Sequence, residues 1–526
     1  MAPDDAALST LIDQHLTEFD KPGVLSIRPG FKIKNDWLTG QRAIVVTVST
    51  KLAQPPAGER LPAEIDGVPV DVRQASPLKR TEIESPETYA AQLHLTPDTG
   101  SVPHFAAERT LAGDHPAVRA SAHAALAAVA KPSLPYSGPL GLTLEPIDAQ
   151  ASIELSASPD SGWPVLAAFL AGTTESLTVG LYDFTSSHVA TTIETAIAGK
   201  QLKLVLDHPP QNPTADQTDQ ATVAELAQAF GADFTQAWAL TRTDKIATAW
   251  IYPTAYHIKV AVRDKSSVWL SSGNWNNSNQ PDIDPVGKLA DAGEARSRDR
   301  DWHVVINQPQ LARLFEAYLL NDLSVAGAHN NAPPAPGPPL PPPKPGSTKT
   351  PVFHQFFGPS SITDSIKIQP LLTPDPGVYV GAVKTLIASA TTTLYMQFQY
   401  IELPKATNAT SQDFVDLVQA VIDRQNAGVE VKIIMSEFEK SGYLEQLQGA
   451  GLNVVDNVKI QNNVHNKGII VDGNAVLVSS QNWSTDGTLY NRDAGVIIHS
   501  DAAARYFQQI FLHDWQYLAR QHAPAD

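Results

Sequence analysis

The sequence predicts a mixed α/β protein made of two similar halves and a small amino-terminal α/β domain. One pattern, His-x-Lys, four residues, Asp, six residues, Ser-Ser-x-Asn-Trp, occurs at 257–275 and again at 465–483. Strand and helix patterns recur in the same order before each copy, and a proline-rich segment separates the two. Because a motif repeated together with its flanking elements indicates an internal repeat, we expect two tandem α/β units.

Length and composition agree with a globular protein of several domains. The chain has 526 residues, of which 42% are hydrophobic and 18% are charged. One hydrophobic core rarely serves so long a chain, and a prior of about 150 residues per domain suggests three or so. We expect a small α/β accessory domain at 1–77, a connecting region at 78–150, one half at 151–327, a proline-rich linker at 328–350 and the other half at 351–526.

The region before residue 150 contains three recognisable elements. Apolar residues recur at helical spacing from Ala6 to Phe19, and residues 43–48 (AIVVTV) are typical of a buried strand. A helix is also predicted at Val118–Ala130, within an Ala- and Pro-rich region. Trp163–Gly172 is strongly apolar but far shorter than the roughly 20 residues needed to cross a bilayer. It predicts a core helix, and no transmembrane segment is expected.

A proline-rich segment lies between the two motifs. Residues 331–347 hold nine prolines in seventeen positions, which favours extended polyproline II conformation and cannot form a core. We interpret this segment as a semi-rigid linker. Residues 338–345 (PPLPPPKP) also suit an aromatic groove. A chain that acts chiefly as a binding module, through this segment or the amino-terminal domain, is therefore an alternative.

The two halves share one order of elements. A strand, a helix and a strand precede each motif: 177–184, 189–198 and 202–206 in the first half, and 393–400, 414–426 and 429–435 in the second. Each motif is then typical of a strand pair. His-x-Lys is predicted to lie on one strand with both side chains on the same face, and VWLSS or AVLVSS forms the next strand. Each motif Asn falls where that second strand ends.

These motifs resemble those of the phospholipase D superfamily, whose members carry two HxKx4D motifs, each followed by a GSxN-like element. The resemblance covers about residues 160–520, with Ser-Ser in place of the usual Gly-Ser pair in both copies. It implies two phospholipase D-like α-β-α sandwich halves related by a pseudo-two-fold axis. It also implies phosphodiester cleavage through a covalent phosphohistidine intermediate, with no metal or other cofactor.

The residue types of the motifs suit attack on a phosphodiester. Because the substrate is an anion, the ammonium groups of Lys259 and Lys467 can offset its charge and that of the transition state. One neutral imidazole can act as nucleophile, while a protonated imidazole gives its proton to the departing alkoxide. The sequence does not show which histidine attacks. By the usual family assignment, His257 is the nucleophile and His465 the general acid.

Other motif positions have expected supporting roles. Asp301 and Asp493, in the matching stretches DRDWHVVI and NRDAGVII, are expected to orient the imidazoles, although family members often carry the longer Glu there. The residues expected to bind substrate phosphate are Ser272, Asn274, Ser480 and Asn482. Asp264 and Asp472 are expected to be scaffold residues. The stretch Gln280–Arg298, absent from the second copy, is expected to form a loop over the mouth of the site.

Two other interpretations of motif residues need to be weighed. His257, Asp264 and Asp301 could ligate zinc, but a Lys two residues from a metal-binding His would repel the ion, so no metal is expected. Trp275 and Trp483 could stack on substrate, although a Trp after a strand end more often packs in a core.

The motifs predict the bond that is cleaved, but not the substrate. A net charge of −17 disfavours a surface that binds nucleic acid through Lys and Arg. Phospholipid headgroup hydrolysis or transphosphatidylation is therefore favoured, with a nuclease acting on DNA or RNA as the alternative. Peripheral membrane contact, hydrolysis versus transfer and oligomeric state stay open.

Localisation is predicted from the amino terminus. No basic region followed by an apolar run occurs there, so cytoplasmic localisation is expected by default. Export by a non-classical route and a mature secreted form are the alternatives. The absence of cysteine leaves the redox compartment unmarked.

Overall fold

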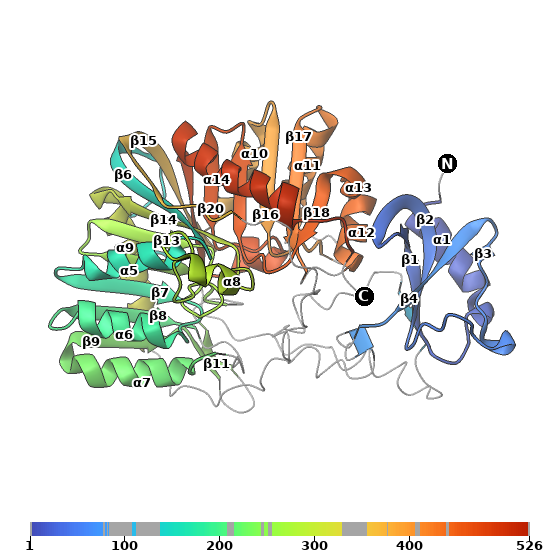
Figure 1. Ribbon diagram of the computed structural model, residues 1–526, viewed down its shortest axis with the longest axis horizontal. Helices are drawn as coiled ribbons and strands as arrows, with labels where there is room; N and C mark the ends of the chain where they lie inside the picture. The colour runs from blue at the N-terminus through green and yellow to red at the C-terminus, as the bar shows by residue number, and fades with distance from the viewer. Residues whose placement is uncertain are drawn as a thin grey trace.

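The computed structural model describes residues 3–76, 79–80, 83, 108–111, 137–207, 215–242, 247–250, 255–328, 355–375, 377–404, 411–437 and 441–523. The helix predicted at 118–130 and the proline-rich segment at 331–347 lie outside these residues. Figure 1 shows a small amino-terminal domain beside a larger α/β body.

The amino-terminal domain is a small sheet covered by one helix. Its strand order is β3-β4-β2-β1-β5, with bounds Glu64–Ile65, Val68–Gln74, Trp37–Val48, Val24–Lys34 and Arg109–Thr110. Helix α1 (Asp5–Gln14) packs Ile12 against this sheet, and Phe19 joins the same core. The helix predicted from Ala6 to Phe19 thus ends earlier, and a short 3-10 turn at Leu16–Glu18 continues it. The strand predicted at 43–48 is the second half of β2.

The amino-terminal domain is attached to the carboxy-terminal part of the chain through buried charges. Glu445, in helix α12 (Ser441–Ala450), accepts hydrogen bonds from the guanidinium groups of Arg28 and Arg73 and from the backbone of Phe31. Both arginines and the glutamate are buried. Since an unpaired buried charge is strongly destabilising, these contacts hold the two parts together firmly.

The larger body is built on one 14-stranded sheet whose strand order reads alike from either end. Seven strands come from the first half and seven from the second. In spatial order they are β18 (Val458–Gln461), β17 (Glu430–Ser436), β16 (Thr393–Phe398), β19 (Lys467–Val471), β20 (Ala475–Ser479), β21 (Asp493–His499), β15 (Ser360–Thr373), β6 (Ile147–Ser158), β14 (Asp301–Asn307), β13 (Ser267–Ser271), β12 (Lys259–Arg263), β7 (Ser176–Leu181), β8 (Gln201–Leu206) and β9 (Phe234–Trp238). The halves meet where β15 pairs antiparallel with β6. Outside this sheet, β10 (Leu240–Arg242) and β11 (Ala247–Trp250) form a hairpin.

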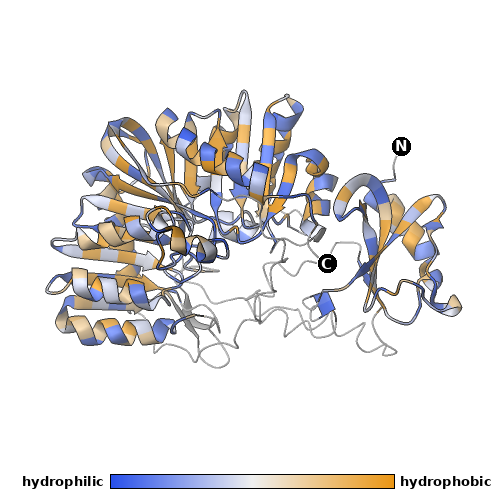
Figure 2. Ribbon diagram, in the orientation of Figure 1, coloured by the Kyte–Doolittle hydropathy of each residue, from blue (hydrophilic) through white to orange (hydrophobic). Residues whose placement is uncertain are grey.

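Helices cover both faces of the sheet in each half. In the first half, α5 (Gly162–Ala171), α6 (Ser187–Ala196) and α7 (Asp219–Phe230) share one core with the sheet, and α9 (Pro309–Ala328) packs on its other face. In the second half, α10 (Val378–Ala388), α11 (Gln412–Asn426), α12 and α13 (Val454–Asn457) correspond to the first set, and α14 (Asp501–His513) corresponds to α9. Figure 2 shows hydrophobic residues concentrated along the strands between these helices. The predicted α/β fold class is confirmed.

The local predictions hold closely for the strands and helices before each motif. The strand predicted at 202–206 is β8, the helix at 414–426 is α11, and the apolar stretch at 163–172 forms α5, a buried helix. One prediction was wrong. The motif strands begin at Lys259 and Lys467, so His257 and His465 lie just before them rather than on them. The reason is that the backbone before each lysine leaves its own sheet neighbour and bonds to the other half.

Candidate active site

Each motif histidine is paired with an aspartate from the opposite half. Nδ1 of His257 lies 2.8 Å from Oδ1 of Asp493, and Nδ1 of His465 lies 3.0 Å from Oδ1 of Asp301. The sequence predicted that these aspartates orient imidazoles without indicating which carboxylate serves which ring. The crossed pairing brings the two motifs together at the interface between the halves.

Backbone contacts explain how the motifs cross. Tyr256, just before His257, forms a bridge with Arg492, and the backbone N–H of Arg492 donates to Ala255. In the mirror arrangement, Arg300 bridges Val464, and the N–H of His465 donates to the carbonyl of Arg300. Each histidine is therefore placed by a segment that directly precedes the opposite aspartate.

Two buried arginines fix these crossing segments. Arg300 pairs with Asp514 through Nε at 2.9 Å and also with Asp160. Arg492 pairs with Asp322 through Nε, likewise at 2.9 Å. Each guanidinium contacts Asp514 or Asp322 with two nitrogens, a geometry that restricts rotation as well as position. Because Arg300 and Arg492 immediately precede Asp301 and Asp493, these ion pairs also position the two carboxylates.

The motif lysines are buried beside the histidines. Nζ of Lys259 donates to the carbonyl oxygen of His257 at 2.5 Å, and Nζ of Lys467 donates to the carbonyl oxygen of His465. Burial lowers the pKa of Lys467 to about 8, while the charges of Asp301 and Asp493 limit the fall. Burial also lowers the pKa of Lys259 well below its usual value. The site thus contains two lysine amines and two aspartate carboxyl groups.

Tyr182 is a site residue that the sequence reasoning missed. Its ring lies edge-on to the His257 imidazole, 4.9 Å between centroids, and the Lys259 ammonium lies 5.3 Å from the ring centre. It follows the last residue of β7, and β7 pairs with the strand that begins at Lys259. The only signal in the sequence was its place at the end of a predicted strand.

The electrostatics of the site keep both imidazoles neutral when no substrate is bound. Burial and the charge of Lys467 lower the pKa of His465 to about 4. Burial, followed by the charges of Lys259 and Lys467, lowers the pKa of His257 well below its usual value. Each ring contacts a carboxylate through Nδ1, so Nε2 is the nitrogen that we assign to the substrate.

The two carboxylates differ in their environments. Burial raises the pKa of Asp493 to about 8, against the opposing charge of Lys259. Burial also tends to raise the pKa of Asp301, but the charge and hydrogen bond of His465 outweigh it and hold that pKa well below its usual range. The two halves are thus alike in topology but unequal in charge.

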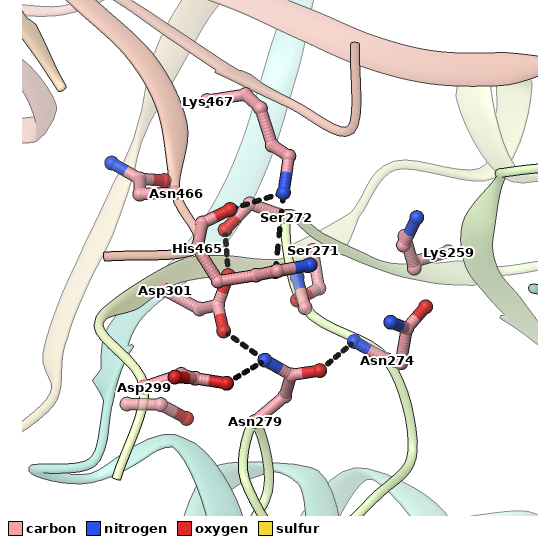
Figure 3. A network of polar contacts seen from close by, with 12 residues as sticks. Lys259, Ser271, Ser272, Asn274, Asn279, Asp299, Asp301, His465, Asn466 and Lys467 are labelled. Atoms are coloured by element: carbon pink, nitrogen blue, oxygen red, sulfur yellow. Dashed lines mark hydrogen bonds and ion pairs between the residues drawn. The ribbon is translucent and has the colours of Figure 1, made fainter. Parts of the chain in front are cut away.

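The motif serines have contacts that differ from the expected ones. Ser272 Oγ donates to Asp301 Oδ1 at 2.7 Å, and Ser480 Oγ donates to Asp493 Oδ1. Their hydroxyl hydrogens are therefore used on the carboxylates rather than offered to a phosphate, because a buried carboxylate needs donors. Asn274 and Asn482 are almost completely buried in the same region. Figure 3 shows the ring of His465 turned toward the side on which Lys259 and Asn274 lie.

Comparison with known protein families agrees with these observations. Residues 383–515, which include the second motif and Asp493, match the family model described as Cardiolipin synthase, PLD-like domain. The resemblance of the motifs to the phospholipase D superfamily is thus confirmed, and residues 383–515 form a phospholipase D-like domain. No curated protein matches it.

Solved structures similar to this phospholipase D-like chain include two bacterial proteins. One is the phosphatidylserine synthase of Haemophilus influenzae Rd KW20, with 13% identity, a TM-score of 0.45, and coverage of 70% of this chain and 87% of that one. The other is Nuc, a phospholipase D family member from Salmonella typhimurium, with 22% identity, a TM-score of 0.25, and coverage of 30% and 97%. Within the described residues, every helix is too short or too polar to span a bilayer.

The third motif position lies at a turn in both phospholipase D-like halves. Asp264 accepts hydrogen bonds from the backbone of residues 174–176 and from the Thr174 hydroxyl. Asp472 does the same for residues 391–393 and the hydroxyls of Thr391 and Thr392. Both carboxylates therefore tie the turn after the motif strand to the start of the neighbouring strand.

The motif tryptophans are buried. Trp275 packs against Phe184 and Trp269, and Trp483 packs against Phe398. These contacts agree with packing rather than substrate stacking. The alternative zinc site is not assembled, because Asp264 is engaged at its turn and Asp301 pairs with His465. Among the residues that the structure describes, no three His, Cys, Asp or Glu side chains are grouped as metal ligands.

The stretch Gln280–Arg298 connects β13 to β14 through a short 3-10 turn (Leu289–Asp291) and α8 (Ala292–Ala295). Its outer part exposes Val286 and Leu289. The residues that flank it lie in the site, because Asn279 contacts both Asp299 and Asp301. Placement of this loop over the mouth of the site stays a prediction.

Proposed function

We propose that this protein cleaves phosphodiesters through a phosphohistidine intermediate, without a metal cofactor. The observation that carries the proposal is the crossed pairing of His257 with Asp493 and of His465 with Asp301. It supplies two imidazoles, each oriented by a carboxylate, at one interface. A nucleophile and a general acid for the same phosphorus centre require such a pair.

In the first step, Nε2 of His257 attacks phosphorus. A nitrogen–phosphorus bond forms, the bond from phosphorus to the leaving oxygen breaks, and His465 donates a proton to that oxygen. The contact of Nδ1 with Asp493 supports the choice of Nε2 as the attacking nitrogen of His257. The pKa of Asp493 is about 8 in the free protein, and the positive charge that the ring acquires favours its ionised form, which in turn stabilises that charge.

In the second step, water or an alcohol attacks the phosphohistidine. His465, now neutral, takes the proton of the attacking hydroxyl, the nitrogen–phosphorus bond breaks, and His257 returns to its neutral form. Water gives hydrolysis and an alcohol gives transfer. The same residues serve both outcomes, so the choice depends on which hydroxyl reaches the intermediate.

The charge that develops on phosphate is offset by protein cations. Lys259 and Lys467 are buried, where an ammonium acts more strongly than in water. We assign amide donation to Asn274 and Asn482, which lie in the same region as the lysines. Ser272 and Ser480 act instead on the carboxylates, since both hydroxyls donate there.

A phospholipid is the substrate class that we favour. The family model that matches residues 383–515 is named for cardiolipin synthase, which is a lipid-related description. The net charge of −17 also disfavours long contacts with nucleic acid backbones. DNA and RNA remain outcomes of the test.

The test is a substrate panel with EDTA present throughout: phosphatidylcholine in mixed micelles, single- and double-stranded DNA, RNA, and bis-p-nitrophenyl phosphate. We expect turnover of the lipid and the small diester, and an acid-labile phosphoenzyme after rapid quenching. The matched control is His257→Ala, which should form no phosphoenzyme. Turnover of nucleic acid alone would replace the lipid proposal, and turnover that requires a metal would contradict the mechanism.

A further inference from the structure

Asn279, to which the proposed mechanism gives no role, lies at the centre of a hydrogen-bond network. Its side-chain nitrogen donates to Oδ2 of Asp301 at 2.9 Å and to Oδ2 of Asp299 at 3.0 Å. Its side-chain oxygen accepts the backbone N–H of Asn274 at 3.1 Å. The residue is buried, and Figure 3 shows this network beneath His465. One amide thus joins the carboxylate that orients His465 to a residue expected to bind phosphate.

The second half has an amide residue at the corresponding place near its own aspartate. There, Asn491 precedes Asp493 by two positions, and its side chain helps to lower the pKa of that carboxyl against the effect of burial. In the first half the corresponding position is Asp299, whose carboxylate cannot donate to Asp301 when ionised. Burial and the charge of Asp301 raise the pKa of Asp299 to about 7. Asn279 supplies the missing amide and separates the two acidic groups.

The local sequence makes room for this amide only in the first half. A Cβ on Gly273 would lie 2.6 Å from Oδ2 of Asp301 and 2.9 Å from Cβ of Asn279, so glycine is required there. In the second motif the same position is Gln481, and the position five residues after the motif Asn is Gly487 instead of Asn279. At these two sequence positions the first copy therefore has glycine followed by an amide residue, and the second copy has an amide residue followed by glycine.

We propose that Asn279 is a positioning residue for the reaction. It holds Asp301 with one oxygen toward His465 and holds the backbone at Asn274, so that the general acid and the phosphate-binding amide are placed together. This role rests on the proposed function of the site. The residue contacts no reacting atom, and its effect passes through Asp301 and Asn274.

The test combines two variants that disturb the network in different ways. Asn279→Leu replaces the amide with an apolar group of similar size, and Gly273→Ala keeps the amide but displaces it. The readouts are kcat and KM on bis-p-nitrophenyl phosphate and the downfield NMR signal of the His465 Nδ1 proton. We expect kcat to fall about 100-fold with little change in KM, because a small misplacement of a catalytic group has this effect. The His465 signal should disappear while the His257 signal remains.

A rescue variant and a control separate positioning from general stability. Asp299→Asn, added to Asn279→Leu, puts an amide where the other half has Asn491, and should restore the His465 signal and most of kcat. Asn307→Leu makes the same substitution at the far end of β14, where the exposed side chain of Asn307 accepts a hydrogen bond from the Ser267 hydroxyl, and should change neither readout.

Two results would overturn the positioning role. One is a folded Asn279→Leu protein with the kcat and the His465 signal of the wild type. The other is a loss that Asp299→Asn does not reverse. If the wild-type protein turns over no phosphodiester, the proposed function fails, but the NMR signals still show whether Asn279 holds the His465–Asp301 pair.

Discussion

Nδ1 of His257 lies 2.8 Å from Oδ1 of Asp493, a residue 236 positions later in the chain and in the other half of the sheet. The mirror pair, His465 and Asp301, spans 164 positions. Each half therefore supplies the imidazole of one pair and the carboxylate of the other. Neither half contains a complete pair.

Because each aspartate pairs with the histidine of the opposite half, substitution of an aspartate should affect the histidine of that opposite half. Asp493→Asn should alter the NMR titration of His257 and leave that of His465 nearly unchanged, and Asp301→Asn should do the reverse. An amide in place of the carboxylate stabilises the imidazolium poorly and favours the wrong tautomer, so kcat should fall roughly 100-fold or more in each variant. If Asp493→Asn acted instead on His465, the assignment of partners would be wrong.

Substitution of either histidine by alanine should block a different step of the reaction. With bis-p-nitrophenyl phosphate the nitrophenolate can leave without a proton, so His465→Ala should still release about one equivalent in a burst and then stop. His257→Ala should show no burst, because no nitrogen attacks phosphorus. Stopped-flow absorbance measures both. A burst in His257→Ala and none in His465→Ala would exchange the roles.

Activity should be higher on the acid side of neutrality. The general acid must carry a proton, and the pKa of His465 in the free protein is about 4, lowered by burial and by Lys467. The pKa of Lys467 is about 8, so its positive charge is lost above that pH. The pKa of His257 is well below its usual value, so the nucleophile stays neutral. We therefore expect kcat/KM to fall steadily from pH 5 to pH 9.

The pH profile is measured with phosphatidylcholine in mixed micelles, whose alcohol leaving group needs a proton, in buffers of constant ionic strength. Lys467→Arg provides the control, since Arg keeps its charge throughout this range. It should flatten the fall above pH 8 and leave the fall below pH 8 in place. A kcat/KM that rises from pH 5 to pH 8 would show that His465 does not act as the acid.

Attachment of the amino-terminal domain should depend on Glu445. Glu445→Gln removes the negative charge that the buried guanidinium groups of Arg28 and Arg73 share, while Arg73 keeps its ion pair with Asp71. Breaking a buried ion pair in this way costs about 3–5 kcal/mol. We expect a lower melting temperature and a larger radius of gyration by X-ray scattering. Asp416→Asn, which breaks the exposed pair with Lys384, should cost less than about 1 kcal/mol.

The local sequence pattern predicted the helices and strands well, but it did not predict which distant segments they contact. The run 202–206 predicted β8 to within one residue because alternating and continuous apolar residues reflect burial in a sheet. His257 was placed on a strand because its own sequence continues the strand pattern. The backbone before His257 leaves the strand because Tyr256 forms a bridge with Arg492 of the other half. The residues next to His257 in the sequence do not indicate this distant contact.

The site residues that the sequence predicted best are those whose side chains take part in the proposed chemistry. His257, Lys259 and their counterparts were identifiable from the duplicated motif alone. Ser272 was assigned to phosphate because its hydroxyl suits that ligand, but the nearby Asp301 uses the donor. Asn279 lies outside the motif, and its role becomes visible only when Asp299 is compared with Asn491 and the turn brings the amide to both carboxylates.

The pairing of β6 with β15 has a consequence for dividing the protein. Ser360–Ile368 lie against Ile147–Leu155 through nine residue pairs. Each half produced alone would present this long strand as a bare edge, and such edges recruit other strands. Two separately expressed fragments should therefore find one another and regain both crossed pairs when mixed. The β6–β15 pairing therefore makes this candidate enzyme suitable for a split-protein assay, in which restored turnover reports that the two fragments have associated.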